Sequence, residues 1–340
     1  RKPVENNVLA CVSDTHVQAI ASAPLTVVKS VRGVGAGPLD TTDPNNFVPL
    51  IDAATGLPYD DLGILKTIPS SSVDCAAPNV AVIGVTNEYY RFPCVPITRP
   101  GGIEEWAATF TNGGNIPITR IAAIDVLPRA NDRGVIVNEA RSSRWAPLLT
   151  GMPVLVDPNP STPSDAVLSV EYITNAAQIA SRCNATDIQV QLGMNATTTP
   201  PVSNASCLNG PAVDALPQRN WLPLTQAIID SDGASIVALR FVITSSTGLV
   251  PGQKISITYR SQTATAPEIA ESASGIDRDS IAYNSIATAA LGDDNGEPRP
   301  NRFVIEPRKV GVAMATGGVE LAKIVDGANA GAAYLEADYL

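Results

Sequence analysis

Histidine is almost absent from this chain of 340 residues, which contains only His16. A single imidazole excludes zinc sites built from several histidines, and it leaves a serine or cysteine nucleophile only one imidazole partner. Charged residues are scarce too, at 16% of the sequence, and the excess of acidic over basic residues gives a net charge of −10. Nucleic acid and anionic membranes repel such a chain, so neither is an expected partner.

Long hydrophobic runs are also missing, because no stretch approaches the roughly 20 consecutive apolar residues of a membrane-spanning helix. Hydrophobic residues nevertheless make up 44% of the chain, which is enough to bury a sizeable core. The 28 prolines and 25 glycines interrupt the sequence too often for long helices. These features together predict an all-β protein.

Short runs in which apolar and polar residues alternate recur along the chain, and this pattern is typical of half-buried strands. Residues 235–244 and 254–260 are two such runs. The segment between them, Leu-Val-Pro-Gly-Gln at 249–253, is rich in turn formers, so we predict a hairpin. The spacing of the runs favours an antiparallel β-sandwich. Further strands are expected near residues 25–32, 80–86, 103–111, 118–126, 167–173, 188–192, 281–290, 302–306 and 319–325.

The two ends of the chain resemble each other. Leu25–Gly33 aligns with Val319–Gly327, which places Lys29 opposite Lys323 and indicates an internal repeat, with chance similarity of short β patterns as the alternative. Neither an initiator methionine nor a signal peptide is present, so we expect a piece of a longer protein that holds one full module and two partial ones. The expected division is into 1–24, terminal strands of a preceding module; 25–318, the full module; and 319–340, the first strand of a following module. Within the full module we expect N-terminal strands and a disulfide loop at 25–100, a sandwich at 101–290 with an insertion at about 138–232, and closing strands at 291–318.

Five cysteines are present, and disulfides are their expected use. Pairing of nearest neighbours predicts bonds between Cys75 and Cys94 and between Cys183 and Cys207, which leaves Cys11 over. Five buried thiols in a reducing compartment are the alternative.

No combination of residues predicts a metal site or another cofactor. The sequence has no Cys-x-x-Cys pair and no cluster of cysteine with histidine. The acidic turns at 230–233 and 293–297 lack the ligand spacing of an EF-hand loop, and turn chemistry alone explains them.

Three N-x-[ST] sequons lie between the last two cysteines, at Asn184, Asn195 and Asn204. Glycosylation and chance in a segment rich in Asn, Ala and Thr explain them equally well. Both interpretations predict that the segment lies at the surface.

Four motifs occur in one order along the chain: Thr-Asn-Gly-Gly-Asn-Ile-Pro-Ile-Thr at 111–119, Asp-Val-Leu-Pro at 125–128, the proline-glycine turn at 249–253 and Ala-Tyr-Asn-Ser-Ile-Ala at 282–287. In this order they resemble the immunoglobulin-like repeat modules of large actinobacterial (Gram-positive) cell-surface and adhesin proteins. The resemblance covers most of 25–290 but not 150–232. It implies an immunoglobulin-like β-sandwich with long loop insertions, in a stalk or adhesive segment of a wall-anchored protein.

We therefore expect a non-enzymatic structural or adhesive repeat module of an extracellular surface protein or filament. Its expected partners are neighbouring copies, paired head to tail through strands, and an unidentified surface ligand. The alternative is a carbohydrate- or protein-binding module with its recognition surface on the 138–232 insertion, where Trp145 or Trp221 would be exposed. An enzyme would need His16 beside a nucleophile and a carboxylate.

Strand parity turns three reactive side chains inward: Lys29, Glu104 and Asn284 each share a face with the apolar residues of their run. A buried ammonium is costly unless it is paired or neutralised. An inward Lys, an acid and an inward Asn resemble the self-forming isopeptide bonds of Gram-positive pilin and adhesin modules. By that resemblance Lys29 is the nucleophile, Asn284 the electrophile, and Glu104 or Asp125 the acid. A lysine that reaches solvent from a strand edge and an asparagine bonded to a turn are the alternative.

Overall fold

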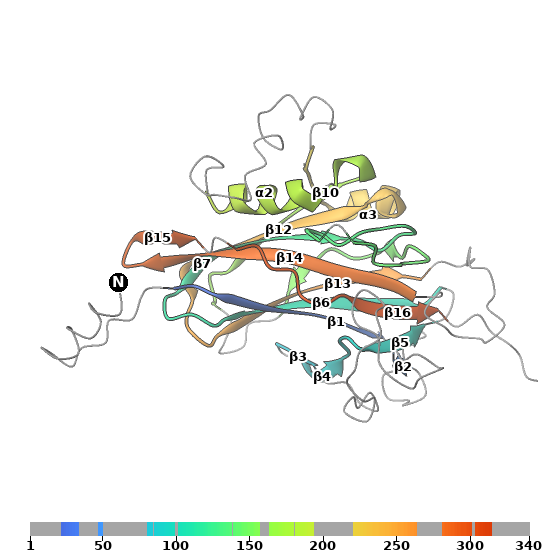
Figure 1. Ribbon diagram of the computed structural model, residues 1–340, viewed down its shortest axis with the longest axis horizontal. Coiled ribbons are helices and arrows are strands. Elements are labelled where there is room, and N and C mark those ends of the chain that lie inside the picture. The colour runs from blue at the N-terminus through green and yellow to red at the C-terminus, as the bar shows by residue number, and fades with distance from the viewer. Residues whose placement is uncertain are drawn as a thin grey trace, which may run out of the picture.

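The architecture is a sandwich of two sheets (Figure 1), and the predicted all-β fold is confirmed. The expected partial modules at 1–24 and 319–340, apart from residues 22–24, lie outside the described part of the chain. The computed structural model describes residues 22–33, 47–49, 80–83, 85–98, 101–137, 139–156, 163–179, 181–193, 220–263, 281–300 and 303–314.

The smaller sheet has the strand order β1-β6-β13-β8, and β9 also pairs with β13. Both β1 and β13 run antiparallel to the central strand β6, which places Lys29 opposite Ala108 and Tyr259 opposite Trp106. Its strands are β1 (Leu25–Gly33), β6 (Ile103–Asn112), β8 (Leu148–Leu149), β9 (Val154–Leu155) and β13 (Lys254–Gln262).

The larger sheet has the order β11-β10-β12-β7-β14-β16-β5-β2, and β15 pairs with β14. The pair β16 and β5 is parallel, and the others among these strands are antiparallel. Its strands are β2 (Phe47–Pro49), β5 (Cys94–Thr98), β7 (Ile118–Val126), β10 (Val167–Ile173), β11 (Leu222–Pro223), β12 (Ala238–Leu249), β14 (Ile281–Asp294), β15 (Glu297–Pro300) and β16 (Val310–Met314).

Both sheets are also covered on their outer faces (Figure 1). A hairpin of β3 (Val80–Val82) and β4 (Val85–Tyr89) covers the smaller sheet, where Tyr89 packs with Ala107. Helix α2 (Ser181–Gln191) covers the larger sheet, where Ile188 packs with Ala122 and Ala289. The small side chains of β7 and β14 on this face allow the helix to approach closely. The other helical segments are α3 (Gln226–Asp232) and the 3₁₀ turns η2 (Ala176–Gln178) and η4 (Gly233–Ser235).

The core lies between the inner faces of the two sheets. Alternate residues of β7 and β14 point into it, so that Ile121 and Ile286 face the smaller sheet while Ile124 faces α2. Trp106 and Phe110 of β6 fill the opposite side of the core and are fully buried. Parity along each strand therefore decides which side chains enter the space between the sheets.

The predicted hairpin of 235–244 and 254–260 is wrong. β12 pairs with β7 and β10 in the larger sheet, whereas β13 pairs with β6 in the smaller one. The turn itself forms: Gly252 has φ +80°, and Gln253 N donates to the Val250 carbonyl at 3.0 Å. The turn carries the chain from the larger sheet to the smaller one. Two consecutive strands can bury their apolar faces either as neighbours in one sheet or on opposite sides of the core, and here they do the latter.

The strand predicted near 188–192 is also wrong, because residues 188–191 form the end of α2 and Leu192 directly follows it. Ile188 and Leu192 are four residues apart and share the buried face of the helix, whereas Val190 is exposed. The strand predicted near 302–306 is reduced to one bridge between Ile305 and Thr288.

The 138–232 insertion is more than a set of loops. It contributes β10, which pairs with β12 over its whole length, and the helix that covers the larger sheet. The insertion therefore belongs to the body of the sandwich.

Candidate functional site

Lys29 lies in the middle of the sandwich, with its side chain fully buried. It projects from β1 on the same face as the buried Val27 and Val31. An amine in this position faces the larger sheet across the core and cannot reach solvent.

The amine of Lys29 contacts one residue from each sheet. Its Nζ donates to Asp125 Oδ2 of β7 at 2.5 Å and to the hydroxyl of Tyr259 of β13 at 3.0 Å. The Tyr259 hydroxyl donates in turn to Asp125 Oδ2 at 2.8 Å. Nζ also lies 4.6 Å from the centre of the Tyr259 ring.

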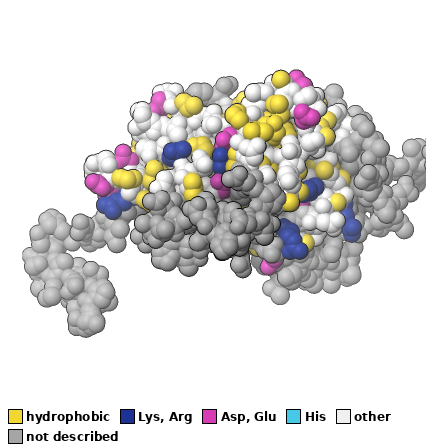
Figure 2. All heavy atoms as spheres, turned by 90° about the horizontal axis from the view of Figure 1, so that it is seen from above, with side chains coloured by type: hydrophobic (Ala, Val, Ile, Leu, Met, Phe, Trp, Pro, Cys, Tyr) yellow, Lys and Arg dark blue, Asp and Glu magenta, His cyan; other side chains and the backbone are white. Residues whose placement is uncertain are grey.

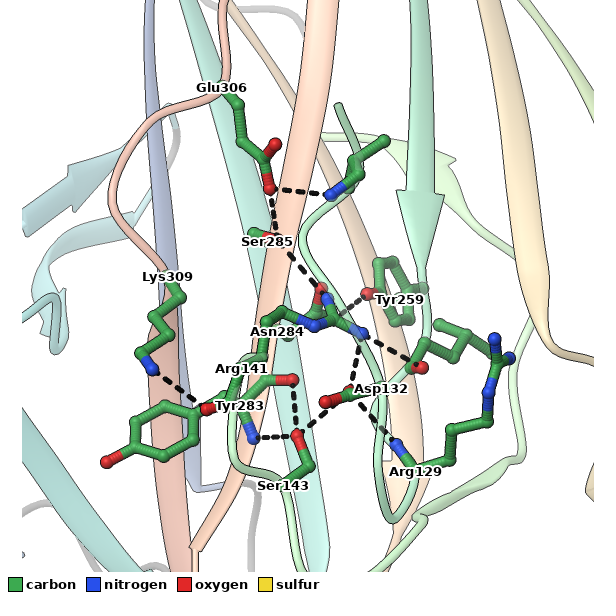
Figure 3. A network of polar contacts seen from close by, with 12 residues as sticks. Arg129, Asp132, Arg141, Ser143, Tyr259, Tyr283, Asn284, Ser285, Glu306 and Lys309 are labelled. Carbon is green, nitrogen blue, oxygen red and sulfur yellow. Dashed lines mark hydrogen bonds and ion pairs between the residues drawn. The ribbon is translucent and has the colours of Figure 1, made fainter. Parts of the chain in front are cut away.

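Asn284 of β14 completes this group, which we call the lysine cluster: Lys29, Asp125, Tyr259 and Asn284. Asn284 Nδ2 donates to the Tyr259 hydroxyl at 2.6 Å (Figure 3). Asn284 is fully buried, and its Oδ1, like Asp125 Oδ1, has no hydrogen-bond partner in the described structure. Two members come from the smaller sheet and two from the larger, so the cluster spans the sandwich.

The cluster shifts the proton affinity of its members. Burial lowers the pKa of Lys29, and this effect outweighs the opposing charge of Asp125, while the positive charge of Arg141 lowers the pKa further. Burial and the charge of Asp125 raise the pKa of Tyr259 well above its ordinary value. Lys29 therefore loses its proton more readily than an exposed lysine, which makes its nucleophilic form easier to reach, and the phenol of Tyr259 holds its proton more tightly than an exposed one.

Glu104 does not contact the cluster. It is fully buried on the inner face of β6, but it pairs with Gly33 and Ser261, four residues along the strand from Ala108, the partner of Lys29. The hydroxyls of Ser261 and Thr263 donate to it, each at 3.1 Å. Burial nevertheless raises the pKa of Glu104 to about 8. Of the two candidate acids, the structure brings Asp125 rather than Glu104 to Lys29.

A second buried polar network adjoins Asn284 (Figure 3). Arg141 donates to Ser285 at 3.2 Å and to Asp132 at 2.6 Å. Glu306 accepts a hydrogen bond from Ser285 at 2.7 Å and others from the backbone N–H groups of 135–137. The network fixes the irregular segment that carries Asp132 and Arg141 on β14. It also holds the Arg141 guanidinium where its charge lowers the pKa of Lys29.

Cys94 and Cys183 are both disulfide-bonded. Their predicted partners, Cys75 and Cys207, lie outside the described residues, and so does Cys11. The pairing therefore stays a prediction.

The structure describes one of the three sequons, and that one does not lie in an exposed surface loop. Asn184 lies in α2, where its side chain is fully buried and donates to the Val135 carbonyl at 2.6 Å. A glycan cannot be accommodated there, because the amide is already bonded inside the fold. Asn195 and Asn204 lie outside the described residues.

The tryptophans that would mark a recognition surface on the insertion have structural contacts. Trp145 is buried in the core. Trp221 donates to Asp187 at 2.5 Å, and the guanidinium of Arg240 lies 4.9 Å from its ring centre. Arg240 also forms ion pairs with Asp187 and Glu171, so the indole helps to hold α2 on the sheet. On the face seen in Figure 2, charged side chains of both signs are scattered among uncharged ones.

In the part of the chain that the structure describes, no three His, Cys, Asp or Glu side chains gather to hold a metal ion. No helix among those residues has the length and hydropathy to cross a membrane. His16, which an enzymatic function would need, lies outside them.

Comparison with known proteins finds distant structural neighbours only. No protein-family model and no curated protein matches the chain. One solved structure is AvmM, described as catalysing macrocyclization in alchivemycin A biosynthesis, with TM-score 0.22 and 9% identity over 66% of this chain and 86% of that one. Another is the Enterococcus faecalis MSCRAMM ACE, a Gram-positive adhesin described as binding its ligands by the collagen hug model, with TM-score 0.24 and 8% identity over 86% of this chain and 91% of that one. TM-scores this low carry no argument about function.

Sequence reasoning missed two residues of the site, Tyr259 and Arg141. Parity places Tyr259 inward with Ile255 and Ile257, and a phenol among aliphatic residues needs a polar partner, which is a signal that sequence analysis could have used. Arg141 lies on an irregular segment without periodicity, so no comparable signal exists.

Proposed function

We propose that this chain is a non-enzymatic structural module of an extracellular surface protein or filament, and that an isopeptide bond between Lys29 and Asn284 ties its two sheets together. The observation that carries the proposal is the buried lysine cluster. It combines an amine with a lowered pKa, a carboxyl group in contact with that amine, and a carboxamide joined to both through one hydroxyl.

The chemistry that the cluster supports is amide exchange within one chain. Lys29 Nζ attacks Cγ of Asn284, ammonia leaves, and Asp125 accepts and returns protons. The reaction consumes the amine of Lys29 and the carboxamide of Asn284, so each chain reacts once and there is no turnover. Lys29 acts as the nucleophile because burial lowers the pKa of its amine, so that Asp125 can take up its proton more easily.

The small stabilisation expected from a buried ion pair favours a chemical role for Lys29 and Asp125 over a purely structural one. Lys29 and Asp125 both have fully buried side chains, and such a pair often stabilises a fold no more than apolar residues of the same volume. Conversion of the ammonium into an amide removes the buried charge and leaves a covalent link in its place.

The position of the bond fits a module that bears load. Lys29 lies on β1 of the smaller sheet and Asn284 on β14 of the larger one, and these two strands contact each other across the core. The bond would join an early strand of the described chain to a late one. In a stalk or filament under tension, such a bond would transmit the force from one strand to the other without unfolding the residues between them.

The proposal is tested by the intact mass of the full chain after reduction of its disulfides. We expect the sequence mass less one ammonia, and tandem mass spectrometry should find the peptide of Lys29 joined to that of Asn284. A loss of one water would instead join Lys29 to Asp125 and would show that Asn284 is not the electrophile. An unchanged mass would falsify the cross-link.

Variants locate the bond. Lys29→Arg and Asn284→Ala should each restore the full sequence mass, because each removes one reacting group. Lys309→Arg is the matched control, since Lys309 is also buried and its Nζ donates to the Arg141 carbonyl at 2.8 Å. This control should keep the loss of ammonia; if it does not, the reacting lysine has been misassigned.

Association of copies head to tail belongs to the same proposal. A filament module should show a mass that rises with concentration in sedimentation or light scattering of the full chain. A monomeric mass at all concentrations would reject self-association and leave the cross-link unaffected.

A further inference from the structure

The hydroxyl of Tyr259 lies between all the reacting groups of the lysine cluster. It accepts hydrogen bonds from Lys29 Nζ at 3.0 Å and from Asn284 Nδ2 at 2.6 Å, and it donates to Asp125 Oδ2 at 2.8 Å. Among the described residues no hydrogen bond joins Asp125 directly to Asn284. The hydrogen-bonded route from the carboxyl group to the leaving nitrogen therefore passes through this hydroxyl.

We propose that Tyr259 is a catalytic residue of the cross-linking reaction and relays the proton of Asp125 to the departing nitrogen of Asn284. This inference rests on the proposed function, because it names a further participant in the Lys29–Asn284 bond. It assigns a chemical role to a side chain that would otherwise count only as core packing.

The first steps release the amine of Lys29 and form the new bond. A proton passes from Lys29 Nζ to Asp125 Oδ2 along their hydrogen bond, which leaves an uncharged amine. The amine lone pair forms a bond to Cγ of Asn284, and the electron pair of the carbonyl moves to Oδ1. Asp125 then gives its proton to the Tyr259 hydroxyl while that hydroxyl gives its own proton to Nδ2.

Collapse of the intermediate completes the exchange. The electron pair returns from Oδ1, the bond from Cγ to Nδ2 breaks, and ammonia leaves. The extra proton on Lys29 Nζ passes to Asp125, so the products are an amide, a protonated carboxyl group, an unchanged tyrosine and ammonia. The total charge is zero before and after.

The contact between Tyr259 and Asn284 suits this relay because its direction can reverse. In the carboxamide, resonance occupies the nitrogen lone pair, so Nδ2 donates to the hydroxyl. In the tetrahedral intermediate the nitrogen is an amine with a free lone pair, and the same short contact then lets the hydroxyl donate to it. The raised pKa of Tyr259 keeps the required proton on the oxygen until that point.

The test follows bond formation over time in the full chain. Wild type, Tyr259→Phe and Tyr89→Phe are made by cell-free synthesis. Samples are quenched in denaturant at successive times, and mass spectrometry of the intact chain measures the loss of ammonia. Tyr89→Phe is the matched control, because it removes another fully buried hydroxyl that donates to a carboxylate, Glu105, at 2.6 Å. We expect Tyr259→Phe to slow the reaction by about 10²-fold or more, the range of general acid–base catalysis, and Tyr89→Phe to leave the rate unchanged.

Fluorinated tyrosines at position 259 separate chemistry from packing. Mono- and difluorotyrosine, inserted by nonsense suppression, keep the hydroxyl and nearly the size of the ring but lower the pKa of the phenol. A relay predicts a rate that changes stepwise with fluorination, which a packing role would not produce. The fluorotyrosine variants also test the relay if Tyr259→Phe does not fold.

The outcomes distinguish the two proposals. Equal rates for wild type and Tyr259→Phe, or for all the fluorinated variants, overturn the relay while the bond itself stands. Absence of ammonia loss in wild type overturns the proposed function and the relay together.

Discussion

Glu104 and Glu105 are adjacent on β6 and have opposite electrostatic environments. Glu104 points into the core, where burial raises its pKa to about 8. Glu105 points outward; burial alone would raise its pKa, but hydrogen bonds from Tyr89 and Arg260 and the charge of Arg32 outweigh this and lower it. One residue step along a strand thus changes which protonation state the fold prefers.

Replacement Glu104→Gln tests this difference at residue scale. The folded chain keeps the Glu104 proton up to about pH 8, whereas the unfolded chain releases it near 4.5, so a rise in pH across this window favours unfolding. The advantage of wild type over the variant should therefore fall with rising pH, by at most about 1.4 kcal/mol per pH unit. Urea denaturation of both proteins across the window measures it.

Glu105→Gln is the matched control and should behave in the opposite way. Its folded pKa is lowered, so its stabilising effect is present above the ordinary carboxyl pKa and is lost as the pH falls. Equal pH dependence of the two variants would contradict the assignment of the inward and outward environments.

At the scale of elements, α2 is held on the larger sheet by packing and by charge. Ile188 is fully buried against β7 and β14, where Ala122 and Ala289 leave room for it. Beside it, Arg240 of β12 pairs with Asp187 of the helix. The insertion is therefore attached through its helix as well as through β10.

Ile188→Ala should destabilise the fold by about 2–5 kcal/mol, because it leaves a cavity between helix and sheet. Val190→Ala on the same helix is the control, since Val190 is 39% exposed and its truncation should cost little. Chemical denaturation gives the two free energies of unfolding. Similar losses for both would show that the helix does not pack on the sheet through Ile188.

At the scale of the whole molecule, the proposed bond would close a loop that contains most of the chain. Cross-linking a loop of this length removes entropy from the unfolded state and would stabilise the fold by about 5 kcal/mol. The same closure would make the segment between Lys29 and Asn284 inextensible under tension.

Single-molecule stretching of the full chain, held at its two ends after reduction of disulfides, measures this effect. Wild type should extend only by the residues outside 29–284, whereas Lys29→Arg should extend along its whole length. Full extension of wild type would mean that no bond joins the two strands.

Much of the fold and part of the site could be predicted because period-two alternation survives in the sequence. It predicted the strands at 118–126 and 167–173 with the observed limits. It failed where local pattern cannot choose between structures: Ile188 and Leu192 fit a strand or a helix face equally, and 249–253 fits a hairpin or a crossing between sheets.

The sequence by itself determined the all-β class and the inward orientation of Lys29, Glu104 and Asn284, because alternation along a strand decides which face each side chain occupies. Only the tertiary structure decided which of these residues meet. Asp125 rather than Glu104 contacts Lys29, and Tyr259 links it to Asn284, since these contacts depend on how two sheets are stacked and in what register. Parity along a strand carries no information about the strand on the other side of the core.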